Sequence, residues 1–351
     1  MGDKDIFDVI IIGCGAAGIG AAIEFEKMES KINYIILEGR GRIGGRAFTD
    51  KTTFGEDIPV DIGAHYLCHG EENNILYEYY IPSEKDFFDI EFYDSSKMKI
   101  FDRNGNIISD DLINEAMKLT EDLFEIVKEY SIDKEDISIF DLINDQLNKI
   151  SDEYMKDLVK MFLSYTELHE GSDLKQISTK SYQRGEGGCQ ISDLTLSNGF
   201  GTLIHQIASK YNLKIQLNSI VTHINLLNNI VEVITKDNHT YLCKYILLTI
   251  PLGCLKSNSI QFSPSLPEWK QAAIDKMGFS LLNKVYLQFS EIFWEKNLQR
   301  INVIHDYLKF YYCLSEYSML ALYIYGDSAR QLEQKTDEEI IEEIVSSLRI
   351  F

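Results

Sequence analysis

The chain has 351 residues, of which 45% are hydrophobic and 25% charged, and its formal net charge is −21. This composition is typical of a globular protein that can bury one large core or two smaller ones. The acidic excess argues against nucleic acid as a partner, because phosphate backbones require clustered Lys and Arg. A cationic substrate fits the charge better, although an acidic surface can also serve solubility alone.

Six cysteines are scattered along the chain without a CxxC pair, and the N-terminal segment lacks the basic and then apolar layout of a signal peptide. The apolar runs near the start are far shorter than the roughly 20 residues that a membrane span needs. We therefore expect free thiols in a reducing compartment, no metal site and no membrane contact. The sequence does not indicate an oligomeric state.

The chain opens with a strand, a glycine turn, a helix and a second strand: FDVIIIG (7–13), a helix over 16–28, and NYIILE (33–38). The turn reads GCGAAG, in which Gly13 permits a tight bend, Gly15 lets the backbone approach a pyrophosphate and Gly18 lets the helix pack on the strand. Glu38 ends the second strand, where an acidic side chain accepts ribose hydroxyls and repels a 2′-phosphate. The alternative is a glycine turn that serves packing alone.

Apolar residues recur at three-to-four spacing over 110–171, which predicts helices. A short helix is predicted over 202–211, followed by three β segments, 214–224, 230–236 and 240–250, that asparagine-containing turns join into a meander. A helix over 269–276 and the strand LLNKVYLQF (281–289) come next. Strand alternation places Lys284, Tyr286 and Gln288 on one face, and Val285, Leu287 and Phe289 on the other.

The last residues read as a helix. Thr336 and Glu339 have capping-box spacing. An apolar stripe follows, made of Ile340, Ile341, Ile344, Val345 and Leu348. No Gly or Asn follows as a C-cap, so the sequence gives no natural stop for this helix.

The stretch from Glu38 to Arg46, EGRGRIGGR, is dense in Gly and Arg and can wrap a diphosphate. It resembles the flavin amine oxidase superfamily, whose members carry a strand-ending acidic residue and a loop that closes in Gly-Gly-Arg. The resemblance implies that Arg46 contacts the pyrophosphate of FAD, a charge-assisted bidentate contact. A solvated basic loop is the alternative.

Three further blocks are similar to the polyamine oxidase branch: VDIGAHYLCHG (60–70), LNSIVTHI (217–224) followed by ILLTIPLGCLK (246–256), and FSPSLPEWKQAAIDKMGFSLLNKVYLQFSEIFW (262–294). The first departs from the family pattern, because Tyr66 replaces a Trp and one extra residue precedes His69. In the second, the resemblance places the backbone of Val221 at the adenine.

Together these blocks imply noncovalent FAD held by Gly13, Gly15, Ala17, Gly18, Glu38, Arg40, Gly44, Gly45, Arg46, Gly63, Ala64, Tyr66, Val221 and Pro251. For the reaction, the resemblance implies a lysine, Lys284, that hydrogen-bonds a water beside flavin N5. His69 would lie in the amine channel and Glu167 would hold a substrate amine. The alternatives are a solvated strand lysine, a loop histidine and a helix-surface carboxylate.

The fold class that follows is α/β, a Rossmann-type FAD-binding domain with a discontinuous α+β substrate domain, the amine oxidase fold. We predict FAD-binding parts at 1–90 and 198–252, a helical part of the substrate domain at 91–197, and its incomplete sheet at 253–351. The final FAD-binding segment of the family is expected to be absent, so we expect a truncated chain that does not sustain normal oxidase activity alone.

The implied function is oxidation of spermine, spermidine or their acetylated forms to an aminoaldehyde, a shorter amine and hydrogen peroxide, with the polyamine and oxygen as partners. A lysine-specific histone demethylase is an alternative, disfavoured because no long coiled-coil insertion and no additional N-terminal domain are present. An inactive remnant is another. We expect a cytoplasmic protein, with a peroxisomal location left open by the missing C-terminal segment.

Overall fold

The computed structural model describes residues 6–55, 57–68, 76, 87–88, 96–184 and 193–349. The chain forms two compact units, each built from two separate stretches of sequence. Unit 1 comprises Met1–Ile90 and Ile191–Phe279, and unit 2 comprises Glu91–Gln190 and Ser280–Phe351.

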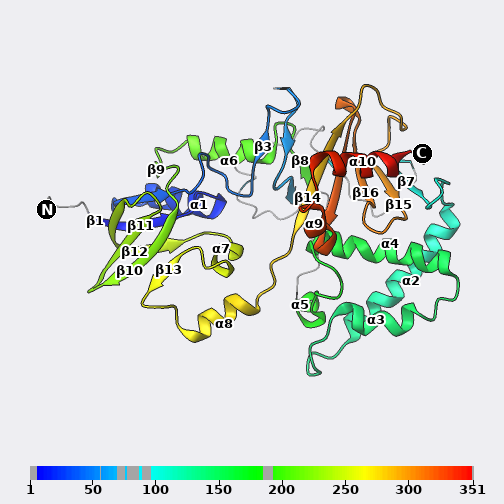
Figure 1. The fold of residues 1–351 in the computed structure, drawn as a ribbon, viewed down its shortest axis with the longest axis horizontal. Coiled ribbons are helices and arrows are strands. Elements are labelled where there is room, and N and C mark those ends of the chain that lie inside the picture. The colour runs from blue at the N-terminus through cyan, green and yellow to red at the C-terminus, as the bar shows by residue number, and fades with distance from the viewer. Residues whose placement is uncertain are drawn as a thin grey trace. The chain divides into compact units, whose positions relative to one another are not determined.

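Unit 1 is built on a seven-stranded sheet of order β13-β10-β11-β12-β1-β2-β9 (Figure 1). Its strands are β1 (Ile6–Ile12), β2 (Tyr34–Leu37), β9 (Ile215–Gln216), β10 (Val221–Leu227), β11 (Ile230–Thr235), β12 (Thr240–Leu248) and β13 (Gln261–Ser263). The neighbours β12, β1, β2 and β9 run parallel, whereas β10, β11 and β12 form an antiparallel meander. The predicted strand–helix–strand opening and the predicted meander are therefore confirmed.

Helices α1 (Ala16–Lys27) and α6 (Phe200–Ser209) pack on one face of this sheet. Ile19 and Ile23 of α1 join Ile11 and Ile36 of the sheet in one buried cluster, to which α6 adds Ile204. Burial of these side chains supplies the hydrophobic stabilisation that fixes α1 on β1. The N-terminus of α1 is thereby held at the carboxyl end of β1.

The single β segment predicted over 214–224 is wrong, because the structure divides it into β9 and β10. The chain turns at Asn218, whose φ of 55° lies in the left-handed region that asparagine tolerates. Before the turn, β9 pairs in parallel with β2, and after it β10 pairs antiparallel with β11. One apolar run thus serves two different partners, which a local pattern cannot reveal.

The remaining elements of unit 1 are short: β3 (Thr49–Asp50), β4 (Val60–Asp61), β5 (Tyr66–Cys68), β6 (Phe87–Phe88), β8 (Asp193–Thr195), α7 (Leu252–Lys256) and α8 (Glu268–Lys276). The structure groups residues 253–279 with unit 1, whereas the sequence analysis assigned them to the substrate domain. The reason is pairing: β13 adds to the seven-stranded sheet beside β10.

The helices predicted over 110–171 are present in unit 2 as α2 (Asp110–Glu129), α3 (Ile139–Leu147) and α4 (Glu153–Glu170), followed by α5 (Thr179–Arg184). Their apolar positions form one core cluster that includes Ile113, Leu123 and Val127. Asp152 caps α4 through its side chain, and Gly171 ends it with a φ of 63°. These caps satisfy backbone groups that would otherwise lack partners.

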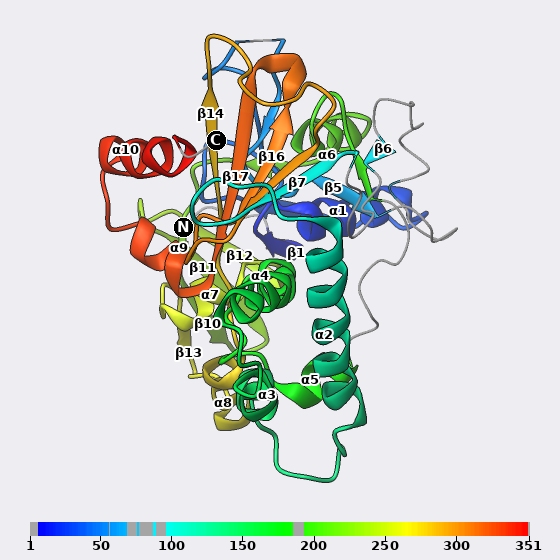
Figure 2. The same cartoon turned by 90° about the vertical axis from the view of Figure 1, so that its right-hand side faces the viewer.

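Unit 2 also holds a five-stranded sheet of order β14-β17-β16-β15-β7 (Figure 2). Its strands are β7 (Met98–Phe101), β14 (Leu282–Gln288), β15 (Arg300–Val303), β16 (Phe310–Leu314) and β17 (Met319–Tyr325). Val285, Leu287 and Phe289 pack on a buried cluster at one face, as the alternation predicted. Lys284 and Tyr286 occupy the opposite face, which we call the polar face.

A 3-10 turn, η3 (Ser315–Tyr317), joins β16 to β17. Two helices follow β17: α9 (Gly326–Leu332) and α10 (Asp337–Leu348). The predicted capping box of Thr336 and Glu339 is confirmed, since both of its hydrogen bonds form. The predicted apolar stripe is wrong at Ile341, whose side chain is 48% exposed, while Ile344 and Leu348 are buried. Ile341 lies beyond the arc of α10 that faces the sheet.

Within the described ranges, no helix has the length and apolar character that crossing a membrane requires. The described cysteine side chains, Cys14, Cys243, Cys254 and Cys313, are free thiols. The described residues also contain no group of His, Cys, Asp and Glu that could hold a metal ion.

Candidate functional site

The glycine turn between β1 and α1 is built by close backbone approach. Gly13 has a φ of 103°, and a Cβ added at Gly18 would lie 2.0 Å from the carbonyl oxygen of Gly13. Thr249 braces this turn, because its hydroxyl donates to the carbonyls of Ile12 at 3.0 Å and Gly13 at 2.9 Å. Sequence reasoning missed Thr249. The feature that could have identified Thr249 is its position directly after β12, the strand that runs parallel to β1.

The N-terminus of α1 is open to an anionic ligand. Gly15 is the N-cap residue and supplies no side-chain cap, and the first turn carries no acidic residue. Ala17 in that turn is exposed. Among the described residues, a Cβ added at Gly15 would meet the Cα of Gly45, at 4.0 Å, and no other atom. Backbone N–H groups and the helix dipole make such a terminus favourable for phosphate.

The Gly-Gly-Arg loop lies directly on this turn. The N–H of Gly44 donates to the carbonyl of Cys14 at 2.8 Å, and Gly15 and Gly44 form a parallel β-bridge. Arg42 holds the loop in shape, because its guanidinium donates to the carbonyl of Gly45 at 3.0 Å and lies 4.1 Å from the centroid of the Phe48 ring. Arg42 is thus a structural arginine.

Arg46 and Arg40 differ from Arg42. Both side chains are exposed, and neither guanidinium has a hydrogen-bond or ion-pair partner among the described residues. An arginine without a protein partner beside an open helix N-terminus is available for a phosphate. The contact of Arg46 with a pyrophosphate stays a prediction, and this arrangement supports it.

Glu38 directly follows β2, beside the glycine turn, and is only 8% exposed. Its carboxylate accepts hydrogen bonds from the backbone N–H of Cys14 at 2.7 Å and of Arg40 at 2.9 Å. Burial, and then the charge of Glu38, raise the pKa of the Cys14 thiol to about 12, so this thiol stays protonated. Glu38 therefore ties the two loops together and keeps lone pairs for a ribose hydroxyl.

The segment with Gly63, Ala64 and Tyr66 runs beside the Gly-Gly-Arg loop. The N–H of Ala64 donates to the carbonyl of Arg46 at 3.0 Å, and a Cβ at Gly63 would lie 1.8 Å from that oxygen. Tyr66 begins β5, and its ring packs edge-on against His65 with centroids 4.7 Å apart. His69, predicted in the amine channel, lies outside the described residues.

Val221 and Pro251 both lie in unit 1. Val221 begins β10, two residues after Ser219, whose N–H donates to the carbonyl of Glu38 at 2.8 Å. This places the start of β10 beside the predicted ribose site. Pro251 is the N-cap residue of α7 and follows Thr249 at the end of β12. Their cofactor contacts stay predictions.

In unit 2, Lys284 lies on the edge strand β14 and is partly buried. Its Nζ is 5.2 Å from the centroid of the Tyr323 ring on β17, and that ring lies 4.4 Å from the ring of Tyr312 on β16. These three residues belong to the polar face of the sheet. A partly buried ammonium on an aromatic surface differs from the solvated strand lysine that was the alternative.

Glu167 lies near the C-terminus of α4 and is also partly buried. One carboxylate oxygen accepts from the N–H of Leu174 at 3.0 Å and the other from the hydroxyl of Tyr325 at 3.1 Å. The ammonium of Lys309 joins this group, at 2.7 Å from the Ser164 hydroxyl and 3.4 Å from that of Tyr325. Burial lowers the pKa of Lys309, and Glu167 opposes that effect.

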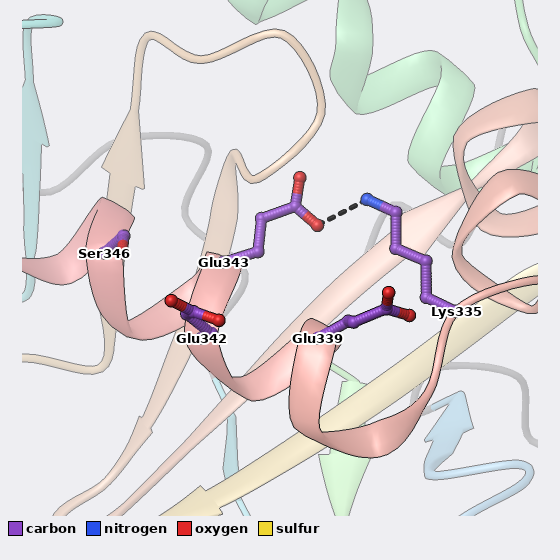
Figure 3. Close-up of a pocket in the computed structure, with 5 residues that line it drawn as sticks. All are labelled: Lys335, Glu339, Glu342, Glu343 and Ser346. Atoms are coloured by element: carbon purple, nitrogen blue, oxygen red, sulfur yellow. Dashed lines mark hydrogen bonds and ion pairs between the residues drawn. The ribbon is translucent and has the colours of Figure 1, made fainter.

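Figure 3 shows a surface pocket of unit 2. It is lined by Lys335, Glu339, Glu342, Glu343 and Ser346, and Lys335 forms an ion pair with Glu343. None of the site residues predicted from the sequence lines this pocket. We therefore assign the chemistry to the groups described above.

The described residues fit an FAD nucleotide. The open position at Gly15, the uncapped N-terminus of α1, the exposed guanidinium of Arg46 and the carboxylate of Glu38 would hold the diphosphate and the ribose. All four groups lie in unit 1.

Comparison with known proteins agrees with this geometry. A family model described as flavin containing amine oxidoreductase matches residues 85–351, and one for an NAD(P)-binding Rossmann-like domain matches residues 11–80. A triple mutant of putrescine oxidase, solved in a redesign of cofactor binding, has the same fold with a TM-score of 0.71 at 17% identity, covering 98% of this chain and 81% of that chain.

Three curated relatives illustrate the sequence similarity. Polyamine oxidase 2 of Arabidopsis thaliana is 29% identical, over 94% of this chain and 69% of its own length. Polyamine oxidase 3 of Oryza sativa subsp. japonica is 31% identical, over 84% of this chain and 62% of its own length. Lysine-specific histone demethylase 1 homolog 3 of Arabidopsis thaliana is 28% identical, over 83% of this chain but only 21% of its own length.

The predicted fold class, a Rossmann-type domain with a discontinuous α+β domain, is thereby confirmed. So is the predicted cofactor, because the matching family is defined by its flavin. The chain belongs to the family of flavin-containing amine oxidoreductases, in its polyamine oxidase branch, and its cofactor is FAD.

Proposed function

We propose that this protein oxidises polyamines such as spermine, spermidine or their acetylated forms. Amine, oxygen and water would give an aminoaldehyde, a shorter amine and hydrogen peroxide. When bound, FAD supplies the acceptor for the hydride and passes the electrons on to oxygen. The observation that carries the proposal is the partly buried ammonium of Lys284 on the polar face of the unit 2 sheet.

An ammonium in this position suits amine oxidation in two ways. A like charge disfavours a protonated amine nearby, and hydride removal requires the neutral amine. The same ammonium can hold a water and deliver protons where oxygen is reduced. The net charge of −21 further favours a cationic substrate over an anionic one.

The roles of Glu167 and His69 stay predictions within this proposal. Both oxygens of Glu167 already accept a hydrogen bond, yet a carboxylate has further lone pairs for a substrate amine. A histone demethylase activity is the second candidate, supported by the similarity to the demethylase homolog. Cytoplasmic location and noncovalent binding of FAD also belong to the proposal.

The test uses the purified full chain loaded with FAD. We expect anaerobic spermine or spermidine to bleach the flavin absorbance, and air to restore it with stoichiometric hydrogen peroxide. Methylated histone peptides, monoamines and L-amino acids are the comparison substrates. Bleaching by a methylated peptide alone would establish the second candidate, and a flavin that no amine bleaches would refute both.

A further inference from the structure

The polar face of the unit 2 sheet places an aromatic ring under the one lysine to which we assign a chemical role. Lys284 on β14 is directly opposite Tyr323 on β17 in the antiparallel register. Side chains at opposite positions of paired strands point to the same face and contact each other. The 5.2 Å between Nζ and the ring centroid is within the range of a cation–π interaction.

The ring itself has little freedom to move. Tyr323 is only 4% exposed, on a strand whose residues are all buried. Its ring stacks on that of Tyr312, with centroids 4.4 Å apart and an angle of 30° between the planes. Phe310, directly opposite Tyr323 on β16, fills the same face. Packing on this side therefore fixes the ring as a surface against which a neighbour can rest.

Lys284, by contrast, is on an edge strand. Among the described residues, β14 is at the end of the strand order and has β17 as its neighbour in this sheet. A lysine on an edge strand has four rotatable side-chain bonds and can reach water easily. Contact with a fixed ring confines the ammonium, and an aromatic face attracts a cation without neutralising it.

We propose that Tyr323, backed by Tyr312, is a positioning residue that holds the ammonium of Lys284 in place. This inference rests on the proposed function, because it deepens the role assigned to Lys284. The face of the ring restrains the position of the ammonium without neutralising its charge.

The matched variants are Tyr323→Leu, which removes the ring, and Tyr323→Phe, which keeps it and removes only the hydroxyl. Tyr311→Leu is the control for general damage to the sheet, because Tyr311 is a fully buried tyrosine of β16 that packs in the apolar cluster on the opposite face. Lys284→Met serves to assign the NMR signal of Lys284, because that signal is absent from the spectrum of this variant.

The first readout does not depend on activity. Lysines of the folded chain are labelled by reductive methylation with carbon-13 formaldehyde, and their methyl signals are recorded by NMR. A lysine held over a ring shows an upfield ring-current displacement. We expect this displacement for Lys284 in the wild type, its loss in Tyr323→Leu, and its retention in Tyr323→Phe and Tyr311→Leu.

The second readout is the rate of flavin reoxidation in the FAD-loaded protein. We expect Tyr323→Leu to slow this step about tenfold with little change in KM, and Tyr323→Phe to restore most of the rate. A Lys284 signal without ring-current displacement in the wild type would overturn the inference, even if Tyr323→Leu failed to fold. Displacement without any effect of Lys284→Met on turnover would instead refute the proposed function of Lys284.

Discussion

The two units of this molecule build their candidate sites in different ways. In unit 1, most of the predicted cofactor groups come from three short runs of sequence, 13–18, 38–46 and 63–66, and these runs contact one another through their backbones. In unit 2, Lys284 and Glu167 are single side chains whose neighbours, Tyr323 and Tyr325, come from distant parts of the chain. A site built from the backbone of short contiguous segments can be predicted from the sequence, whereas the contacts between side chains from distant segments cannot.

The comparison predicts that unit 1 does not tolerate an added side-chain atom where two of its backbone segments approach each other closely. Gly18→Val should destabilise unit 1 by about 3 kcal/mol or more and abolish FAD binding, because a Cβ would lie 2.0 Å from the carbonyl oxygen of Gly13. Gly20→Ala in the same helix is the control, since no atom of the described residues lies within 4 Å of a Cβ added there. We expect it to stabilise the protein by about 0.5–1 kcal/mol.

Urea unfolding followed by fluorescence, with FAD titration of each variant, measures both effects. Equal stability of Gly18→Val and Gly20→Ala would mean that the glycine turn is not closely packed. In that case the proposed difference between the backbone site of unit 1 and the side-chain site of unit 2 would lose its main support.

Unit 2 should show the opposite behaviour, a large effect on chemistry with little effect on cofactor binding. Lys284→Met should slow turnover about 100-fold, mostly in flavin reoxidation, because it removes the ammonium and keeps much of the side-chain volume. Stopped-flow measurement of each half-reaction distinguishes the steps. Lys296→Met, at an exposed lysine of unit 2, is the control. Unchanged half-reactions in Lys284→Met would remove its assigned role.

The arginines of unit 1 sharpen the comparison within a single loop. Arg46→Ala should weaken FAD binding about 10- to 100-fold and leave the free energy of unfolding without cofactor nearly unchanged, because its guanidinium has no partner among the described residues. Arg42→Ala should lower that free energy by about 1 kcal/mol, since it removes bonds to the carbonyls of Ile43 and Gly45. Flavin retained through dialysis in Arg46→Ala would contradict the predicted pyrophosphate contact.

The smallest expected effect concerns Lys309 in unit 2. Burial lowers its pKa in the folded state, so the unfolded chain binds the proton more readily between that pKa and 10.5. The free energy of unfolding should therefore rise with pH in this window, by at most about 1.4 kcal/mol per pH unit. Lys309→Met should remove this rise.

The groups around Lys309 act on its pKa in opposite directions. Glu167, Asp306 and Asp173 favour its ammonium and Arg103 opposes it, but burial has the largest effect. Lys296→Met, at the exposed site, should keep the pH dependence of the wild type. A wild-type curve that falls with pH in this window would show that the carboxylates outweigh burial.

The elements that depend on neighbours along the chain could be predicted from the residues alone. These are the strand–helix–strand opening around GCGAAG, the helices from 110 to 171, and the capping box of Thr336 and Glu339. Each follows from local rules of glycine conformation, apolar periodicity or capping, which act over a few residues.

The pairing of distant strands and the contacts between distant side chains could be seen in the tertiary structure alone. It divided 214–224 between two partner strands, turned Ile341 to solvent, and braced the glycine turn with Thr249. It also set Tyr323 under Lys284 and Tyr325 on Glu167. Strand register and helix docking bring together residues about 40 to 240 positions apart, and they are chosen by the burial of whole faces, a quantity that no local pattern contains.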